Sequence, residues 1–280
     1  MRVALVTGAN QGLGLALVEG LVSRLEVGDL VYLTGRSADR VRAAVEQLEH
    51  GRAEVQGEVL DVGSTSAIAR FAVELRARHG GVDIVFSNAA ARLTPETPGA
   101  DLVGPFVDTN NLGTTRVLRA FGPILRPGGR LLVVASDFGT LRNLPEPLHE
   151  RFDTDTLTLD GLDATMLAWR DAVVEGKAGE EGWPDWINIP SKVGQVAAVR
   201  ILARVRRAAD ARDGTLVAAV CPGLVDTAAS RPWFEDMSRA QTPAQAAAAL
   251  LRLALDPEVD QRFYGELVQF GRVIPWTGPS

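Results

Sequence analysis

The chain has 280 residues, 46% hydrophobic and 23% charged, which is the composition of an ordinary globular protein with one large core. A net charge of −6 without a basic stripe argues against nucleic acid as the main partner. The single cysteine, Cys221, excludes an intrachain disulfide framework and suits a reducing cytoplasm. The N-terminus lacks a signal-peptide pattern, and the richest apolar tract, residues 246–255, is short and carries Arg252, so we expect no membrane span.

The chain begins with a strand, a glycine-rich turn and a helix. Val3 to Val6 is an apolar run of the length of a buried strand, and leucines then recur every fourth residue from Leu13 to Leu25. Between them lies Thr7-Gly8-Ala9-Asn10-Gln11-Gly12-Leu13-Gly14. In this context the glycines allow the backbone to approach a pyrophosphate at a helix N-terminus. The alternative is a tight turn without a ligand.

The end of the second strand carries a basic residue where NAD-binding folds carry an acidic one. Leu30 to Thr34 is the predicted strand, and a helix follows from Ser37 to about His50. Arg36 stands 22 residues after Gly14, near the position that reads the adenine ribose. A guanidinium pairs well with a 2′-phosphate, so Arg36 favours NADP over NAD; the alternative is a surface arginine.

Three further strands are predicted, each followed by small or polar residues. The strands cover residues 54–60, 82–86 and 130–135, and helices cover 64–78 and 106–121. Residues 93–105, with three prolines, are expected to form a loop, and Pro127-Gly128-Gly129 a turn. Asp61 either accepts a hydrogen bond from adenine or serves only in its turn.

The alternation of strand and helix predicts the fold class. It is typical of βαβ units, so we expect a Rossmann-type, doubly wound parallel α/β sheet of about seven strands with helices on both faces. Ligands in such sheets bind beyond the carboxyl ends of the strands. The predicted strand ends carry Gly8, Arg36, Asp61, Asn88 and Ser136.

The second half adds an insertion and completes a single domain over residues 1–280. Residues 140–187 interrupt the alternation of strands and helices, and we expect them to form short helices outside the sheet, at 148–153 and 160–176. A long helix from Lys192 to about Ala209, strands at 215–220 and 265–270, and a helix at 243–255 follow. Arg231-Pro232-Trp233-Phe234 is interpreted as a mobile aromatic lid. The three histidines, His50, His79 and His149, are widely spaced and predict no metal site.

These motifs together resemble the short-chain dehydrogenase/reductase family over nearly the whole chain, and within it the monomeric, NADPH-dependent carbonyl reductases. The resemblance rests on the glycine motif, the Asp61 turn, Asn88-Ala89, Asn110, Ser136, Lys192, Pro222-Gly223-x3-Thr227, and an insertion that ends in Glu181-Gly182-Trp183-Pro184. In those relatives the insertion covers the surface used for tetramers, which implies a monomer. The expected NADP contacts are Gly8, Asn10, Gln11, Gly12, Leu13, Gly14, Arg36, Asp61, Val62, Asn88, Ala89, Lys192, Pro222, Gly223, Val225 and Thr227.

One position departs from the family pattern. The family places its catalytic tyrosine four residues before the active-site lysine, and here that position holds Asn188. The only tyrosines are Tyr32, in the second strand, and Tyr264, before the last. The resemblance implies that Ser136 holds the substrate carbonyl, that Lys192 binds the nicotinamide ribose, and that Asn110 holds a water. Asn188 would then donate a hydrogen bond to the developing oxyanion, and the proton would come from water or through a chain of Lys192, water and Asn110. The alternative interpretation of Asn188 is a helix N-cap without a catalytic role.

Three functions therefore stay open from sequence. The first is an NADPH-dependent reductase of small, apolar or aromatic carbonyl compounds, with a non-standard proton donor and a preference for reactive aldehydes or quinones. The second is an NADP(H)-binding sensor or interaction protein without carbonyl reduction. The third is a lyase-type variant. Trp183, Trp186, Trp233 and Phe234 suggest an aromatic-lined pocket, although tryptophans are also common core residues.

Overall fold

A computed structural model describes residues 1–48 and 51–278, and its centre is a twisted sheet of eight strands. Along the sheet the order is β3-β2-β1-β4-β5-β6-β7-β8, and every neighbouring pair except β7 and β8 is parallel. The strands are β1 (Val3–Val6), β2 (Leu30–Gly35), β3 (Glu54–Val59), β4 (Val82–Ser87), β5 (Leu125–Val134), β6 (Leu216–Val220), β7 (Leu267–Gln269) and β8 (Arg272–Ile274). This confirms the doubly wound α/β class predicted from the sequence.

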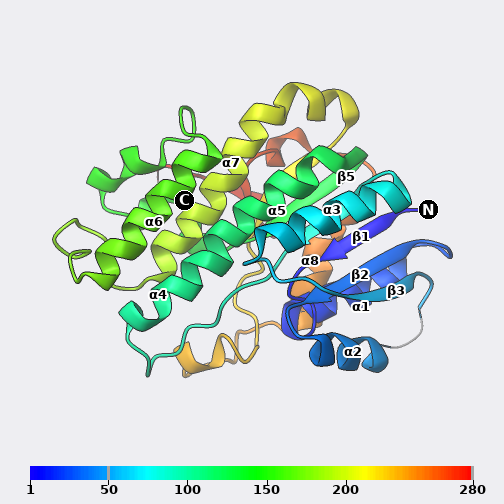
Figure 1. Cartoon of the computed structure of the whole chain (residues 1–280), viewed down its shortest axis with the longest axis horizontal. Coiled ribbons are helices and arrows are strands. Elements are labelled where there is room, and N and C mark those ends of the chain that lie inside the picture. The colour runs from blue at the N-terminus through cyan, green and yellow to red at the C-terminus, as the bar shows by residue number, and fades with distance from the viewer. Residues whose placement is uncertain (49–50, 279–280) are drawn as a thin grey trace.

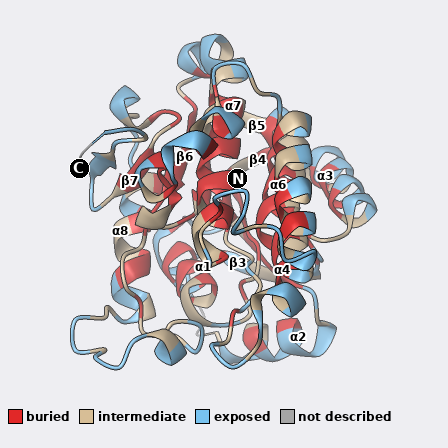
Figure 2. Cartoon of the chain, turned by 90° about the vertical axis from the view of Figure 1, so that its left-hand side faces the viewer, coloured by how far each residue is buried: buried red, intermediate tan, exposed pale blue. Residues whose placement is uncertain are grey.

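Helices cover both faces of the sheet (Figure 1). The helices are α1 (Gly12–Arg24), α2 (Ala38–Gln47), α3 (Thr65–His79), α4 (Gly99–Val107), α5 (Gly113–Phe121), α6 (Leu159–Val174), α7 (Asn188–Asp213) and α8 (Pro243–Leu255). On one face α1 packs against α8, and on the other α3, α5 and α7 are successive neighbours. Figure 2 shows the buried residues gathered in the strands and on the inner sides of the helices. The predicted end of α2 at His50 lies outside the described residues.

The core follows from the apolar strands of a sheet covered on both faces. Every residue of β1 and β6 is buried, as expected for strands in the middle of a parallel sheet. The helix N-termini are set by local signals where these exist. Thr242 and Gln245 form a capping box at α8, and Ser64 caps α3. These hydrogen bonds fix the first residues of α3 and α8.

The segment predicted as a loop at 93–105 contains a helix instead. α4 begins at Gly99 and includes Pro105, so the proline signal was misleading. Val103, Phe106 and Val107 are buried on one side of α4, which packs against α6. Burial of this apolar face outweighs the hydrogen bond lost at the proline. The predicted helix 106–121 is also interrupted, by a π-helical turn over Asp108–Leu112.

Two details of the sheet differ from the predictions. Pro127-Gly128-Gly129 is not a turn before a strand but an irregularity within β5. The pairing of β5 with β4 shifts between Val82 and Ile84, and Gly128 has a φ of 77° there. The last strand, predicted at 265–270, is a shorter β7 followed by an antiparallel β8, which makes eight strands rather than about seven.

The insertion lies outside the sheet, as predicted. A 3₁₀ helix over Glu146–Phe152 leads into α6, which packs against α4 and α7 (Figure 1). Phe152, Trp169 and Trp183 are buried, and their rings lie about 6 Å apart, at 6.1 Å for Phe152–Trp183 and 6.0 Å for Trp169–Trp183. Trp183 therefore belongs to the core of the insertion and not to a pocket.

Candidate active site

Two neighbouring cavities open beyond the carboxyl ends of the parallel strands. The first, of about 330 Å³, lies over β1, β2 and β3. The second, of about 480 Å³, lies beyond β4, β5 and β6. Ala90, just after β4, lines both, so the two cavities adjoin at the edge where ligands of doubly wound sheets bind.

The glycine-rich turn is built for close approach of the backbone. Gly8 and Gly12 have positive φ angles of 62° and 57°, and a Cβ on Gly14 would lie 2.5 Å from the carbonyl oxygen of Gly8. Gln11, at the N-cap of α1, gives no side-chain cap, so the first-turn N–H groups remain for a ligand. An uncapped helix N-terminus beside a cavity fits the pyrophosphate of a dinucleotide.

Asn88 and Thr7 join the glycine turn to the end of β4. The Asn88 amide donates hydrogen bonds to the carbonyls of Thr7, at 3.0 Å, and Gly8, at 3.1 Å. The Thr7 hydroxyl accepts the backbone N–H groups of Asn88 and Ala89. Asn88 therefore holds the turn in shape, whereas Ala89 lines the first cavity.

The first cavity carries two arginines at its outer end. Arg36 follows β2, and Arg40, which sequence reasoning missed, stands one helical turn later on α2; both line the cavity and are exposed. Arg36 precedes the Ser37 N-cap of α2 and Arg40 lies in its first turn, so both cations stand at the N-terminal end of this helix. Asp61 also lines the cavity, while its carboxylate accepts the Gly63 N–H at 2.9 Å. The turn role considered for Asp61 is therefore present.

The predicted site residues divide between the two cavities. Those lining the first are Gly8, Asn10, Gln11, Arg36, Asp61, Val62 and Ala89. Those lining the second are Leu13, Asn110, Ser136, Asn188, Lys192, Pro222, Gly223, Val225 and Thr227. Gly12, Gly14 and Asn88 line neither and shape the turn instead. The structure thus gathers the four predicted catalytic residues, Asn110, Ser136, Asn188 and Lys192, around one cavity.

Asn188 begins α7, one turn before Lys192. The N-cap position is held by Ile187, which gives no side-chain cap, and Asn188 is the first helical residue. The N-cap interpretation of Asn188 was therefore wrong by one residue. Helical geometry places residues 188 and 192 on one side of α7, which is why both line the cavity.

Lys192 is held by a chain of polar side chains that the sequence did not reveal. Its ammonium donates to Oε1 of Gln195 at 2.7 Å, and Nε2 of Gln195 donates to the Thr114 hydroxyl at 3.2 Å. The Thr114 hydroxyl donates to the backbone carbonyl of Asn110 at 2.6 Å. Burial lowers the pKa of Lys192 to about 8, and the Cys221 thiol opposes this slightly. These contacts connect Lys192 through Gln195 and Thr114 to the backbone carbonyl of Asn110.

Asn110 sits in the π-helical turn. Its side-chain oxygen accepts the N–H of Ala91 at 2.8 Å, which ties the turn to the loop after β4. Asn110 is buried, so this bond fixes the wall of the cavity from beneath.

The Ser136 hydroxyl is engaged by its neighbour. Ser136 lies just after β5, at the N-cap of a 3₁₀ turn over Asp137–Gly139. Its Oγ donates a hydrogen bond to Oδ1 of Asp137 at 2.9 Å. Oγ also accepts the N–H of Phe138 at 3.4 Å. Asp137 lines the same cavity and is its one acidic residue among the described lining residues. In this arrangement the hydroxyl proton of Ser136 points to a carboxylate rather than into open space.

Neither tyrosine lies at the cavity. The Tyr32 hydroxyl is within 2.9 Å of Nε2 of His79, and the Tyr264 hydroxyl donates to Oδ2 of Asp210 at 2.7 Å. Burial is the main cause that raises the pKa of Tyr264 above its usual value, and the Asp210 carboxylate adds to it. Both phenols are thus committed to structural contacts elsewhere, and neither replaces an active-site tyrosine.

Aromatic rings form one wall of the second cavity. Trp186, from the end of the insertion, lies edge-to-face with Phe138 at 5.0 Å and tilted against Trp233 at 5.8 Å. Trp233 belongs to a 3₁₀ turn over Arg231–Trp233, in the segment interpreted as a lid, and Phe234 follows it into the lining. The predicted aromatic pocket therefore contains Trp186, Trp233 and Phe234, together with Phe138.

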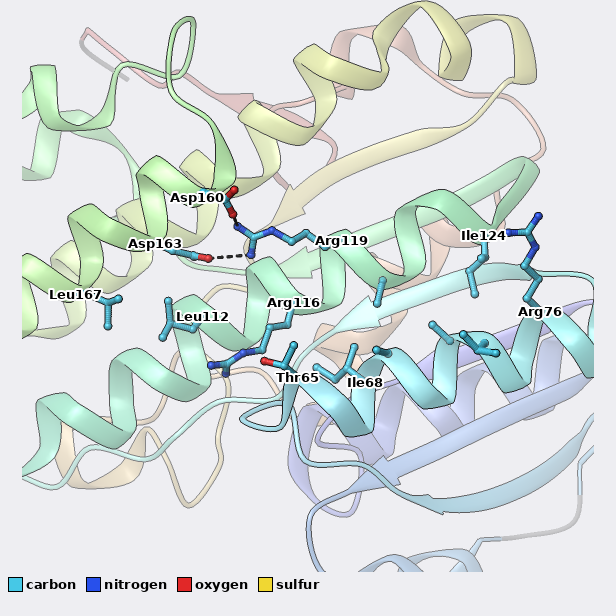
Figure 3. A pocket seen from close by; sticks show the side chains of 14 residues that line it. Thr65, Ile68, Arg76, Leu112, Arg116, Arg119, Ile124, Asp160, Asp163 and Leu167 are labelled. Atoms are coloured by element: carbon cyan, nitrogen blue, oxygen red, sulfur yellow. Dashed lines mark hydrogen bonds and ion pairs between the residues drawn. The ribbon is translucent and has the colours of Figure 1, made fainter.

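A larger hollow of about 690 Å³ lies elsewhere, between α3, α5 and α6 (Figure 3). Its two carboxylates, Asp160 and Asp163, both bond Arg119, as the dashed lines in Figure 3 show. Exposed ion pairs of this kind contribute little to stability, and we assign no chemistry to this hollow. Within the described residues, no group of three or more His, Cys, Asp or Glu side chains could hold a metal ion. No described helix is long and apolar enough to cross a membrane.

The sequence profile of short chain dehydrogenases matches residues 2–146, which contain the glycine turn and the first five strands up to Ser136. Carbonyl reductase (NADPH) 3 of Rattus norvegicus is 36% identical over 282 residues, covering 98% of each chain. Carbonyl reductase (NADPH) 1 of Sus scrofa is 33% identical, covering 99% of this chain and 95% of its own. The chain therefore belongs to the short-chain dehydrogenase family of oxidoreductases.

Solved structures agree on the fold. Salutaridine reductase of Papaver somniferum superposes with a TM-score of 0.79 at 24% identity, covering 95% of this chain and 99% of its own. Menthone neomenthol reductase of Mentha piperita gives a TM-score of 0.77 at 23% identity, covering 97% and 99%. These neighbours share the single-domain Rossmann-type architecture.

Proposed function

We propose that this chain is an NADP(H)-dependent oxidoreductase that reduces reactive carbonyl compounds without a tyrosine acid. The observation that carries the proposal is the shared lining of the second cavity by Asn110, Ser136, Asn188 and Lys192, beside the first cavity, whose glycine turn suits a dinucleotide. A protein that only bound the cofactor would need Lys192 alone among these four.

The choice of NADP rests on charge at the outer end of the first cavity. Arg36 and Arg40 both line it, and two guanidinium groups suit a 2′-phosphate. The acidic residue that binds a free ribose 2′-hydroxyl is absent from the described end of β2. The names of the two carbonyl reductase relatives, which specify NADPH, support the same choice.

The residues of the second cavity then have separate tasks. Lys192, protonated at neutral pH, holds the ribose of the nicotinamide half, and its bond to Gln195 fixes its direction. The cofactor supplies a hydride when bound. The amide of Asn188 donates a hydrogen bond to the oxygen on which negative charge develops, and cannot release a proton. The proton then comes from water admitted to the cavity.

The missing acid sets the range of substrates. A positioned general acid is typically worth about 10²–10⁴-fold in rate. Plain ketones need that assistance most, whereas quinones and reactive aldehydes accept a hydride more readily. The rings of Phe138, Trp186 and Trp233 favour apolar or aromatic substrates of this kind.

Steady-state oxidation of NADPH with a panel of quinones, aldehydes and plain ketones tests the proposal. We expect turnover of quinones and reactive aldehydes, weak turnover of ketones, and a loss with Asn188→Ala. The matched control is Gln261→Ala, which removes an exposed side-chain amide outside both cavity linings. Turnover of plain ketones as fast as of quinones would refute the substrate range.

A second candidate function, NADP(H) binding without carbonyl reduction, is favoured by one observation. The Ser136 hydroxyl already donates its proton to Asp137 and in this arrangement has none to donate to a substrate carbonyl. Tight NADPH binding with no turnover on any member of the panel, and a large gain in Asn188→Tyr, would establish this function instead.

We also propose a cytoplasmic monomer. The single thiol, Cys221, is buried, and α6 of the insertion covers α4 and α7 on one face (Figure 1). Light scattering of the purified chain should give the 29.9 kDa of one copy, and a dimer or tetramer mass would contradict the assignment.

A further inference from the structure

We propose that the second cavity binds a cationic substrate and that its preferred reaction is reduction of an iminium group, C=N⁺, rather than of a neutral ketone. The inference rests on the proposed NADP(H)-dependent hydride transfer and names a substrate class for the same site. It follows from a carboxylate, a set of aromatic rings and the absence of a tyrosine acid, which meet in one cavity.

Asp137 supplies the negative charge. It lines the cavity directly after Ser136, and the Ser136 hydroxyl donates to its Oδ1 at 2.9 Å. A hydrogen bond to the charged form stabilises a carboxylate. The same pair opposes a ketone, because an oxygen that gains negative charge beside Asp137 is repelled and loses the Ser136 donor. A substrate that begins as a cation is attracted instead.

The aromatic wall suits a cation as well. Phe138 and Trp186 lie 5.0 Å apart edge-to-face, and Trp186 lies 5.8 Å from Trp233. Faces of tryptophan and phenylalanine rings attract organic cations, with indole the strongest. All three rings line the cavity that contains Asp137.

Two basic residues, Lys192 and Arg92, also line the cavity, and their positive charges oppose the attraction of Asp137 for a cation. Lys192 donates to Gln195 at 2.7 Å, so its ammonium is engaged on the α7 side. Arg92 is exposed, where solvent screens its charge. Asp137 is the one carboxylate among the described lining residues, so the attraction for a cation depends on it.

The chemistry balances without the group that this chain lacks. In R₂C=NR₂⁺ the nitrogen is already electron-deficient; a hydride from NADPH forms the new C–H bond, and the π pair of C=N moves to nitrogen. NADPH is oxidised to NADP⁺, the iminium is reduced to a tertiary amine, and no proton is consumed in the step. A ketone would need a proton donor at Asn188, whereas an iminium whose nitrogen is fully alkylated needs none, because hydride addition gives a neutral amine directly.

The test compares a charged and a neutral substrate of the same two-ring shape. The probes are N-methyl dihydroisoquinolinium and α-tetralone, assayed with NADPH in the native chain and in Asp137→Asn. We expect Asp137→Asn to lower kcat/KM for the iminium at least ~10-fold, which is about the cost of losing one charge-assisted contact. The same substitution should raise kcat/KM for tetralone above that of the native chain. Asp185→Asn removes one exposed carboxylate next to Trp186, outside the lining, and should match the native chain.

A binding measurement separates this inference from the proposed function. Quenching of indole fluorescence by N-methyl tetrahydroisoquinoline, protonated at neutral pH, should be saturable in the native chain and ~10-fold weaker in Asp137→Asn. Asp137→Ser, a smaller side chain, should weaken it equally, which guards against misfolding of one variant. Equal amine affinity in native, Asp137→Asn and Asp137→Ser chains would overturn the inference, while NADPH binding and quinone turnover would still uphold the proposed function. Failure to bind NADPH would contradict the proposed function itself.

Discussion

The ammonium of Lys192 donates a hydrogen bond to Oε1 of Gln195 at 2.7 Å, three residues further along α7. Gln195 is buried, and through Thr114 it reaches the backbone of Asn110 in the π-helical turn. The hydrogen bond to Gln195 therefore fixes the orientation of the Lys192 ammonium, which is also partly shielded from water. Both properties lead to a measurable dependence on pH.

The pH prediction follows from the lowered pKa of Lys192. Because that pKa is about 8, the side chain is charged at pH 7 and neutral well above pH 8. The charged form holds the cofactor ribose, so NADPH affinity should fall about tenfold as pH rises through 8, the worth of one charge-assisted hydrogen bond. Gln195→Glu places a carboxylate beside the ammonium and should move the break to higher pH. Titration of NADPH fluorescence measures both; a break at the same pH in both chains would rule out Lys192 as its source.

Arg36 and Arg40 should determine the choice of cofactor. Arg36→Ala or Arg40→Ala should weaken NADPH binding roughly tenfold to a hundredfold, since each removes a charge-assisted bond, and should leave NADH binding nearly unchanged. Arg42→Ala is the control, because Arg42 lies on the same helix but pairs with Asp39 and lies outside the cavity lining. Parallel loss of NADH and NADPH affinity would contradict phosphate recognition.

Tyr264 should matter for stability and not for turnover. Its hydroxyl donates to the buried carboxylate of Asp210, which Arg206 also contacts at 2.7 Å. Tyr264→Phe removes one of the two donors to Oδ2 of that carboxylate and leaves only Arg206 on it. The loss of a hydrogen bond to a buried charged group should lower the free energy of unfolding by about 1–3 kcal/mol. Urea denaturation measures the loss, and kcat on a quinone should stay within twofold of the native value. A collapse of kcat in the folded variant would make Tyr264 part of the chemistry.

Gly14 tests the close packing of the glycine turn. A Cβ there would lie 2.5 Å from both Nδ2 of Asn88 and the carbonyl oxygen of Gly8. Gly14→Ala should therefore distort the turn at a cost of about 1–3 kcal/mol and weaken NADPH binding. Gly104→Ala, where a Cβ meets nothing within 4 Å, should affect neither stability nor cofactor affinity appreciably. Unchanged NADPH affinity in folded Gly14→Ala would remove the turn from the binding site.

The sequence was sufficient to predict the parts of the fold that local chemistry determines. The glycine turn requires positive φ at Gly8 and Gly12, and the strands are apolar runs bounded by turn residues, so both can be read along the chain. The site residues at strand ends follow from topology alone, because parallel strands bring their carboxyl ends to one edge.

What the sequence did not reveal depends on contacts across the fold. α4 forms despite Pro105 because α6 covers its apolar side. The local sequence of α4 does not predict this packing against α6. Gln195 became important only when the π-helical turn placed Thr114 within its reach. The role of Asp137 depends on its bond to Ser136 and on its place in the cavity, and both are contacts of the folded chain.

In our proposal the site transfers hydride but lacks the proton donor that a tyrosine at position 188 would supply. The most direct measurement is kcat/KM of NADPH oxidation with acetophenone, a plain ketone, in the native chain, Asn188→Tyr and Asn188→Phe. We expect weak native activity, a gain of at least ~100-fold in Asn188→Tyr, which restores a proton donor, and no gain in Asn188→Phe, which adds only bulk. Native turnover that equals or exceeds that of Asn188→Tyr would show that the missing tyrosine costs nothing and would contradict the proposal.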